Sequence, residues 1–178
     1  MSQSATLYRI SEDSFEQLKK LDDKQQFPVT TLAKGYSIFH GTFLGLEFIL
    51  SKGKDTQTAE LISEIFTPQQ SLGDENLENM TLDEQIEFYE NGGPIYYLDK
   101  KIISAINMLL INITDSYIDE MYDSTELNDN GIYPNIWHDD NSSDLAYNKR
   151  HLQEDITALK QIFKQADEDN NYMLVYVG

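Results

Sequence analysis

The sequence predicts a helix-rich α+β fold in a single domain, residues 1–178, with a small mixed or antiparallel sheet. Three observations predict it: a short apolar strand pattern near each end of the chain, several segments of helical periodicity between them, and no internal repeat or linker. A chain of 178 residues, of which 40% are hydrophobic, is long enough to bury one core. We therefore expect the N- and C-terminal strands to belong to the same sheet.

The N-terminal segment has the pattern of a strand followed by a helix. Residues 7–10 are a short apolar run typical of a strand, and Ser11 can cap the helix that follows. The apolar residues of that helix recur at helical spacing, and they are Phe15, Leu18 and Leu21. Phe27 and Pro28 end this unit.

The next apolar segment predicts one long helix over residues 31–50, with Gly53 just beyond its end. Gly35, Gly41 and Gly45 lie within it, and each weakens a helix by up to about 1 kcal/mol relative to alanine. We therefore expect close backbone packing along this helix or a break near Gly41. A short helix over residues 58–66 is expected to follow and to end before Pro68.

The middle of the chain predicts an irregular connection, a capped helix, a strand and a second helix. Residues 69–80 are polar and irregular, and Thr81 and Glu84 then have the spacing of a capping box. A turn at residues 91–94 precedes an apolar strand at residues 95–98. Asp99 opens the most regular helix, whose apolar residues follow the i, i+3, i+4 rule: Ile102, Ile103, Ile106, Leu109, Leu110 and Ile113.

The C-terminal part predicts two more helices and a final strand. Thr114 and Asp115 are expected to cap a helix that bears Tyr117, Ile118, Met121 and Tyr122, and residues 128–131, Asn-Asp-Asn-Gly, predict a turn. A long helix follows with one apolar stripe, made of Leu152, Ile156, Leu159, Phe163 and Ala166. Residues 172–177 are an apolar strand, which we expect at the centre of the sheet or beside the first strand.

The charge of the chain is strongly negative and unevenly distributed. The formal net charge is −18, from 31 acidic and 13 basic residues. Residues 55–148 hold twenty of the acidic residues and only two basic ones, Lys100 and Lys101, so this segment carries the whole imbalance. Such a field repels phosphates and anionic membranes and speeds encounter with cationic surfaces. We therefore expect a basic protein as the partner, with no binding to nucleic acid or membrane, or else an acidity that serves only solubility.

Several function classes are excluded or left without a motif. The sequence contains no cysteine, which excludes disulfides and thiolate catalysis. The first residues lack the basic flank and apolar run of a signal peptide, and no apolar stretch approaches the roughly 20 residues that span a bilayer. A cytoplasmic location is expected. The motifs of serine hydrolases, P-loop proteins and dinucleotide-binding proteins are absent, so we expect no cofactor.

The histidines do not predict a metal centre. No two of the three histidines, His40, His138 and His151, have the spacing of about one helical turn that lets a helix bind a metal ion through both. His138 is followed by Asp139 and Asp140, which could ligate a metal, but a solvated turn is the more common role of such a sequence.

The most unusual local segment is Tyr133-Pro134-Asn135-Ile136-Trp137. Tyr133 and Trp137 could be aromatic anchors at a binding site, because such residues dominate interface energetics. Alternatively, Trp137 could cover the core above the last helix, since aromatic side chains also dominate core burial. The core role is favoured for Trp137 on this ground, and both roles remain open.

This segment and several others resemble the YfbM-like family, small bacterial proteins grouped as a domain of unknown function. The resemblance is carried by residues 132–137, the acidic turn and long helix after them, and the closing strand at residues 174–177. Residues 96–110 and 46–53 are similar to the family's middle strand and helix and to one of its helix ends. Glu47 and Phe43 depart from it, since many relatives have histidine and tryptophan there. The resemblance implies an α+β fold and a bacterial cytoplasmic protein, with no established activity.

The first functional hypothesis is a non-catalytic binding protein, specifically an immunity protein that neutralises a cognate bacterial toxin. Toxins that act on nucleic acids or nucleotides need cationic active sites, and an acidic surface can occupy such a site. The expected partner-binding residues are Asp115, Asp119, Glu120, Asp123, Tyr133, Trp137, Asp139, Asp140 and Asp144. The alternative from another class is a small-molecule or metal-dependent enzyme with a site near Trp137 and His138.

Overall fold

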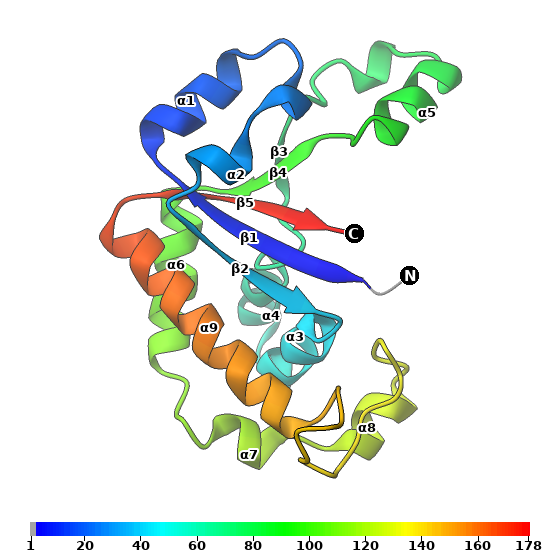
Figure 1. Cartoon of the computed structure of the whole chain (residues 1–178), viewed down its shortest axis with the longest axis vertical. Coiled ribbons are helices and arrows are strands. Elements are labelled where there is room, and N and C mark those ends of the chain that lie inside the picture. The colour runs from blue at the N-terminus through cyan, green and yellow to red at the C-terminus, as the bar shows by residue number, and fades with distance from the viewer. Residues whose placement is uncertain (1–2) are drawn as a thin grey trace.

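A five-stranded antiparallel sheet, in the order β2-β1-β5-β4-β3, forms the centre of the fold (Figure 1). The structure is a computed structural model, and residues 3–178 are described. The strands are β1 (Ser4–Ile10), β2 (Gly35–His40), β3 (Gln70–Leu72), β4 (Ile95–Leu98) and β5 (Tyr172–Val177). The predicted helix-rich α+β fold is confirmed, and β5 lies beside β1 at the centre of the sheet, as expected.

Helices connect the strands and account for much of the chain. They are α1 (Glu12–Lys20), α2 (Val29–Leu32), α3 (Phe43–Ser51), α4 (Thr56–Ser63), α5 (Leu82–Glu90), α6 (Lys100–Ile111), α7 (Tyr117–Met121), α8 (Ser124–Asp129) and α9 (Lys149–Glu168). Two short 3₁₀ turns, Lys24–Gln26 and Leu77–Asn79, add to them. Within the described residues, none of the helices is both long and apolar enough to cross a bilayer.

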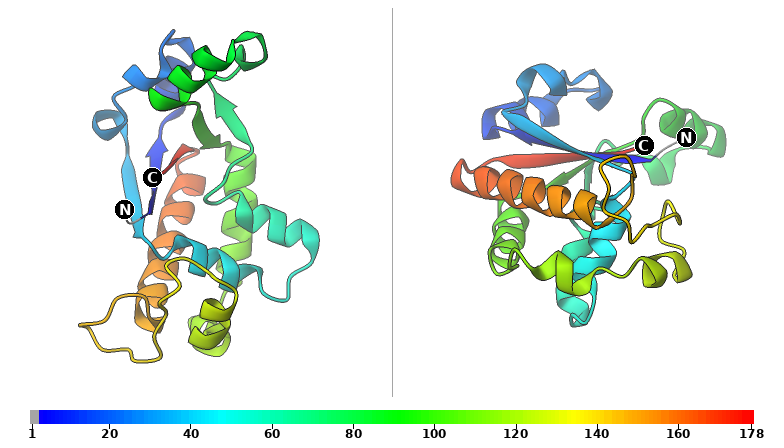
Figure 2. Two further views of the ribbon diagram at one scale, coloured as in Figure 1. Left: turned by 90° about the vertical axis from the view of Figure 1, so that its right-hand side faces the viewer. Right: turned by 60° about the horizontal axis from the view of Figure 1, so that its bottom comes forward.

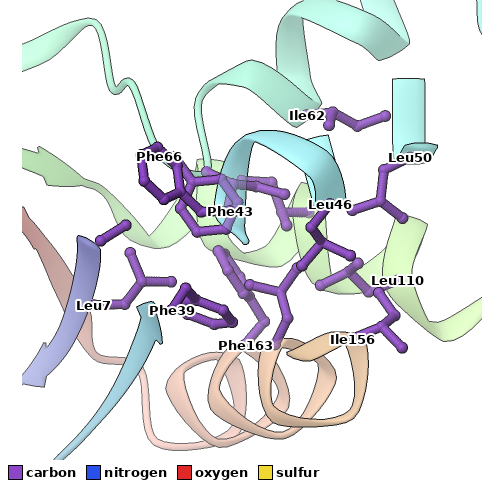
Figure 3. Packing of buried hydrophobic residues seen from close by; sticks show 14 of the residues in the cluster. Leu7, Phe39, Phe43, Leu46, Leu50, Ile62, Phe66, Leu110, Ile156 and Phe163 are labelled. Carbon is purple, nitrogen blue, oxygen red and sulfur yellow. The ribbon is translucent and has the colours of Figure 1, made fainter. Parts of the chain in front are cut away.

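The larger hydrophobic core lies on one face of the sheet. Helices α9 and α6 lie side by side there, and α3 and α4 close the layer (Figures 1 and 2). Phe39 from β2, Leu46 from α3 and Phe163 from α9 meet in the middle of this core, each fully or almost fully buried (Figure 3). The predicted apolar stripes of α6 and α9 therefore face the sheet and each other.

A smaller core covers part of the opposite face. Helix α1 packs Phe15 and Leu18 against Ile10 and Leu174 of the two central strands. The Phe15 ring stacks on Tyr172 with the ring centroids 3.9 Å apart. The predicted cap of α1 is confirmed, because the Ser11 side chain accepts a hydrogen bond from the Ser14 backbone N–H.

A buried arginine of β1, Arg9, connects this strand to the segments beside both of its neighbours, β5 and β2. Arg9 Nη1 donates to Asp169 Oδ2 at 2.9 Å and to Asn171 Oδ1 at 3.1 Å, and its Nη2 donates to the Lys34 carbonyl at 3.2 Å. Asp169 and Asn171 lie in the turn between α9 and β5, and Lys34 precedes β2. The ion pair with Asp169 compensates the buried charge, and Arg9 Nε has no hydrogen-bond partner within residues 3–178.

The predicted helix over residues 31–50 is wrong in its first half. Residues 35–40 form strand β2, and the helix begins only at Phe43. Gly41, with φ +70°, separates the two elements, so the expected break near Gly41 is confirmed. The physical reason for the strand is the pairing of β2 with β1, which satisfies the backbone groups that a helix would have satisfied internally.

Two shorter stretches also differ from the expectation. Residues 69–80 contain strand β3 and a 3₁₀ turn, because β3 pairs with the edge of β4. The helix expected after Asp115 begins later, at Tyr117, with Ser116 in the cap position, and a further helix, α8, precedes the turn at residues 128–131. The caps at Thr81 and Asp99 are confirmed.

Trp137 is a core residue and not an exposed aromatic anchor. Its side chain is only 3% exposed, and Nε1 donates to the Ile132 carbonyl at 2.9 Å. The ring lies directly on Gly45 of α3, where a Cβ atom would be 2.4 Å from Trp137 Cζ2 and Cη2. Glycine at this position therefore allows the indole to pack against the helix backbone.

We predict that Gly45→Ala destabilises the fold. The added methyl group overpacks the contact with Trp137, which costs about 1–3 kcal/mol, more than the up to about 1 kcal/mol that alanine gains over glycine in a helix. Urea unfolding monitored by circular dichroism measures the difference. In a Trp137→Phe background the same substitution should cost much less, because phenylalanine lacks the outer ring of the indole. An equal cost in both backgrounds would contradict this account of the contact.

Candidate functional site

The acidic residues predicted to bind a partner gather at one end of the molecule. Helices α7 and α8 and the loop of residues 138–148 form this end, at the bottom of Figure 1 and of the left view in Figure 2. All seven side chains are exposed: Asp115, Asp119, Glu120, Asp123, Asp139, Asp140 and Asp144. We call these seven residues the acidic end.

Two of these acids also hold the local backbone in place. Asp123 caps α8 by accepting a hydrogen bond from the Glu126 backbone N–H at 3.0 Å. Asp139 accepts a hydrogen bond of 2.7 Å from the hydroxyl of Ser124, the first residue of α8. Tyr122 donates to the His138 carbonyl at 2.6 Å, and burial raises the pKa of this tyrosine to about 12. Helix α8 and the start of the 138–148 loop are thereby fixed to each other.

The rest of the loop of residues 138–148 is held in shape by one buried side-chain amide, that of Asn148. Its Nδ2 donates to the carbonyls of Asp140, Ser142 and Leu145 at 3.0, 3.3 and 3.1 Å. Its Oδ1 caps α9 by accepting from the His151 backbone N–H at 3.2 Å. The side chain is fully buried, so Asp140 and Asp144 extend from a loop that is tied to the longest helix.

Lysines neutralise part of the acidic end. Lys149 pairs with Asp119 at 3.0 Å, and Lys160 lies 3.9 Å from Asp115. Within residues 3–178, Glu120, Asp140 and Asp144 form no ion pair. Their negative charges therefore remain available to a cationic surface.

A groove of about 690 Å³ lies beside the acidic end, and Tyr133 belongs to it. Its walls come from α3 and from residues 131–133, and Phe48 and Leu44 give it an apolar lining. Lys52, at its rim, pairs with Glu126 of α8 and so connects the groove to the acidic end. Of the two predicted aromatic anchors, the structure places Tyr133 in the groove and Trp137 in the core.

The groove also contains Glu47, which the sequence reasoning did not assign to the site. Burial raises the pKa of its carboxyl, and the Ser63 hydroxyl lowers it in part. Within residues 3–178, Glu47 has no basic partner in an ion pair. A signal was present in the sequence, because Glu47 is the one charged residue in the apolar run of residues 43–50. A half-buried carboxylate with aromatic neighbours can accept an ammonium or guanidinium group.

The alternative hypothesis placed an enzyme site near Trp137 and His138. The Trp137 ring is covered by α3. In the described part of the chain, no group of three or more His, Asp or Glu side chains is arranged to hold a metal ion.

A second half-buried carboxylate, Asp155, lies on α9 away from the groove. Burial raises its pKa to about 6, the Thr42 hydroxyl opposes this effect, and Glu154 adds to it. Asp155 Oδ2 is shielded from solvent and accepts no hydrogen bond from residues 3–178. Asp155 is therefore a titrating group that destabilises the fold when it is ionised.

We predict that Asp155→Asn stabilises the protein above pH 6. Between about pH 4 and pH 6 the unfolded chain has lost this proton while the folded chain retains it, so the free energy of unfolding falls as the pH rises through this window. The variant avoids the loss and should be more stable by roughly 1–3 kcal/mol at pH 7, with no difference below about pH 4. Urea unfolding across this pH range tests it. The exposed Asp129→Asn is the control, and an equal effect of both variants would contradict the assignment.

Comparison with known proteins agrees with the fold described above. The YfbM structure from Escherichia coli, a protein of unknown function, is similar with a TM-score of 0.62 and 13% sequence identity, and the match covers 100% of both chains. This likeness confirms the predicted YfbM-like fold. No match is found among curated proteins. The family model of a domain of unknown function, DUF1877, matches residues 1–176. The chain therefore belongs to the DUF1877 family.

Proposed function

We propose that this protein is a non-catalytic binding protein that docks its acidic end on a basic protein. We further propose that the partner is a bacterial toxin with a basic active-site region, which would make the protein an immunity protein. The observation that carries the proposal is the group of exposed carboxylates on α7, α8 and the 138–148 loop, several of which form no ion pair in residues 3–178.

The chemistry of the acidic end suits capture of a cationic surface. Carboxylates held on one side of a molecule steer a cationic partner during diffusion and raise the association rate at low salt. The loop bonds of Asn148 and the contact of Ser124 with Asp139 fix the backbone, so little conformational freedom has to be lost on binding.

The groove supplies a place for an anchoring side chain. Tyr133 and Phe48 offer aromatic and apolar contact, and Glu47 offers a negative charge at a partly buried position. A lysine or arginine of the partner could enter with its aliphatic stem against the rings and its charge on Glu47. Toxins that act on nucleic acids or nucleotides have such side chains in their active sites, since these must bind phosphates.

We predict that complex formation depends on salt and on the unpaired acids of this end. The variant Glu120→Gln/Asp140→Asn/Asp144→Asn should lower the association rate constant by about tenfold at low ionic strength, because it removes part of the steering field. The association rate constant of the wild type should also fall steeply as the ionic strength rises to about 0.15 M, where the Debye length is about 8 Å. Stopped-flow mixing with the partner, isolated by pull-down from the native host and identified by mass spectrometry, measures both effects.

The matched control removes the same charge elsewhere. Asp13→Asn/Glu60→Gln/Glu168→Gln changes three exposed acids that lie outside the acidic end, and it should leave the association rate almost unchanged. A rate that is independent of salt, or an equal effect of both triple variants, would count against electrostatic capture by this end. A co-purifying metabolic enzyme in place of a toxin would contradict the immunity role.

A further inference from the structure

A second surface, far from the acidic end, carries an apolar stripe that the protein itself does not cover. It belongs to α5 and the residues around it, 73–94, which we call the α5 arm. Figures 1 and 2 show the arm at the opposite end of the long axis from α7 and α8. No residue of α5 is buried, which distinguishes it from the other helices of comparable length.

The exposed apolar residues of α5 lie on one face of the helix. Leu82, Ile86 and Tyr89 are 71%, 49% and 56% exposed, and their spacing of four and three residues places them in one stripe. The other face of the helix carries Glu84 and Phe88, which line a cavity of about 760 Å³ between the arm and residues 22–25. The stripe therefore points away from the body of the protein.

Helix α5 is well formed without any partner on its apolar face. The Thr81 hydroxyl and the Glu84 carboxylate make a reciprocal capping box at its N-terminus. Gln85 Nε2 donates to the carbonyls of Leu77 and Met80 at 3.1 and 3.2 Å and thereby attaches the helix to the preceding turn. A helix that is already ordered loses little conformational entropy when it binds.

Negative charge borders the stripe along one side. Asp83 and Glu90 of α5 flank the stripe there, whereas Glu75, Glu84 and Glu87 line the cavity behind the helix and Glu78 precedes it. Within residues 3–178, none of these six carboxylates forms an ion pair. The nearby Lys24 instead directs its ammonium group to the carbonyls of Lys19 and Leu21.

The apolar stripe and the carboxylates beside it together indicate what kind of partner could bind to this face of α5. A second copy of the chain would bring Asp83 and Glu90 toward the same carboxylates of the other copy, and an anionic bilayer would meet the same repulsion. A cationic protein surface would gain both from burial of the stripe and from these flanking carboxylates.

We propose that α5 is a docking helix whose Leu82, Ile86 and Tyr89 side chains enter an apolar groove bordered by lysine and arginine on a protein partner. The recognition has the form of an amphipathic helix in a groove, in which residues i, i+4 and i+7 are the anchors. This inference rests on the proposed function, because it assigns to the same basic partner class a second contact surface.

The first test uses a defined probe, a fluorescent helical peptide of leucine and lysine whose apolar face is bordered by lysines. Fluorescence anisotropy at about 50 mM salt measures its affinity for the full chain. The variant Leu82→Ala/Ile86→Ala should weaken binding by about tenfold or more, while alanine preserves the helix. Met108→Ala/Ile111→Ala is the matched control, because these two residues of α6 are 66% and 67% exposed, and it should change the affinity less than twofold.

Control peptides and variants separate the contributions. A leucine–glutamate peptide of the same pattern should not bind, and Asp83→Asn/Glu87→Gln/Glu90→Gln should weaken the lysine peptide in a salt-dependent manner. Circular dichroism of each variant shows whether α5 is retained. The proposal is overturned if the α5 and α6 variants bind the peptide equally, if the chain dimerises through α5 in sedimentation, or if Leu82→Ala/Ile86→Ala abolishes binding to anionic vesicles.

The second test uses the partner isolated from the host and distinguishes the two proposals. If the triple variant of the acidic end slows association and the α5 variant does not, the docking role of α5 fails and the proposed function stands. If only the α5 variant weakens the complex, the acidic end is not the contact surface and the proposed function fails in that form. Losses from both variants support both proposals.

Discussion

Strand β1 pairs with β5 on one side and with β2 on the other, and the remaining elements take their positions from these two pairings. The alternating side chains of β1 divide the molecule into two layers, with Leu7 in the larger core and Ile10 against α1. Arg9, on the same face of β1 as Leu7, joins β1 to the α9–β5 turn and to the segment before β2. Since the N- and C-terminal strands are adjacent, the fold closes only when the last residues of the chain have joined the sheet.

The path from this sheet to the proposed binding surface runs through α9. Its C-terminal part packs Phe163 and Ala166 into the core, and its N-terminus is capped by Asn148. The same asparagine organises the loop that carries Asp140 and Asp144. The loop of the acidic end is thus attached to the core through α9. This attachment explains how its surface charges can keep a fixed arrangement.

Sequence periodicity predicted the elements whose signals are local. The stripes of α6 and α9 follow the helical repeat over several turns, and their faces are buried as expected. Strand β2 was missed because its identity depends on pairing with residues 4–9, about thirty positions earlier in the chain. The burial of Trp137 depends on the missing side chain of Gly45, which no pattern near Trp137 reveals. The acidic residues of the proposed site were predicted from composition, whereas Glu47 and the groove required the contact between α3 and residues 131–133. The stripe of α5 could be recognised from its spacing, but the same spacing ordinarily predicts a core face, and only the structure shows that nothing covers it.

The position of α5 and of the acidic end at opposite poles of the long axis has a consequence for stoichiometry. A compact domain that occupies one pole leaves the other accessible, so two molecules can be held at once without steric conflict. A single partner can engage both poles only if it is long enough to extend along the molecule or has two modules joined by a linker. In that arrangement the two contacts reinforce each other through effective concentration, and a weak affinity at each pole is enough for a stable complex.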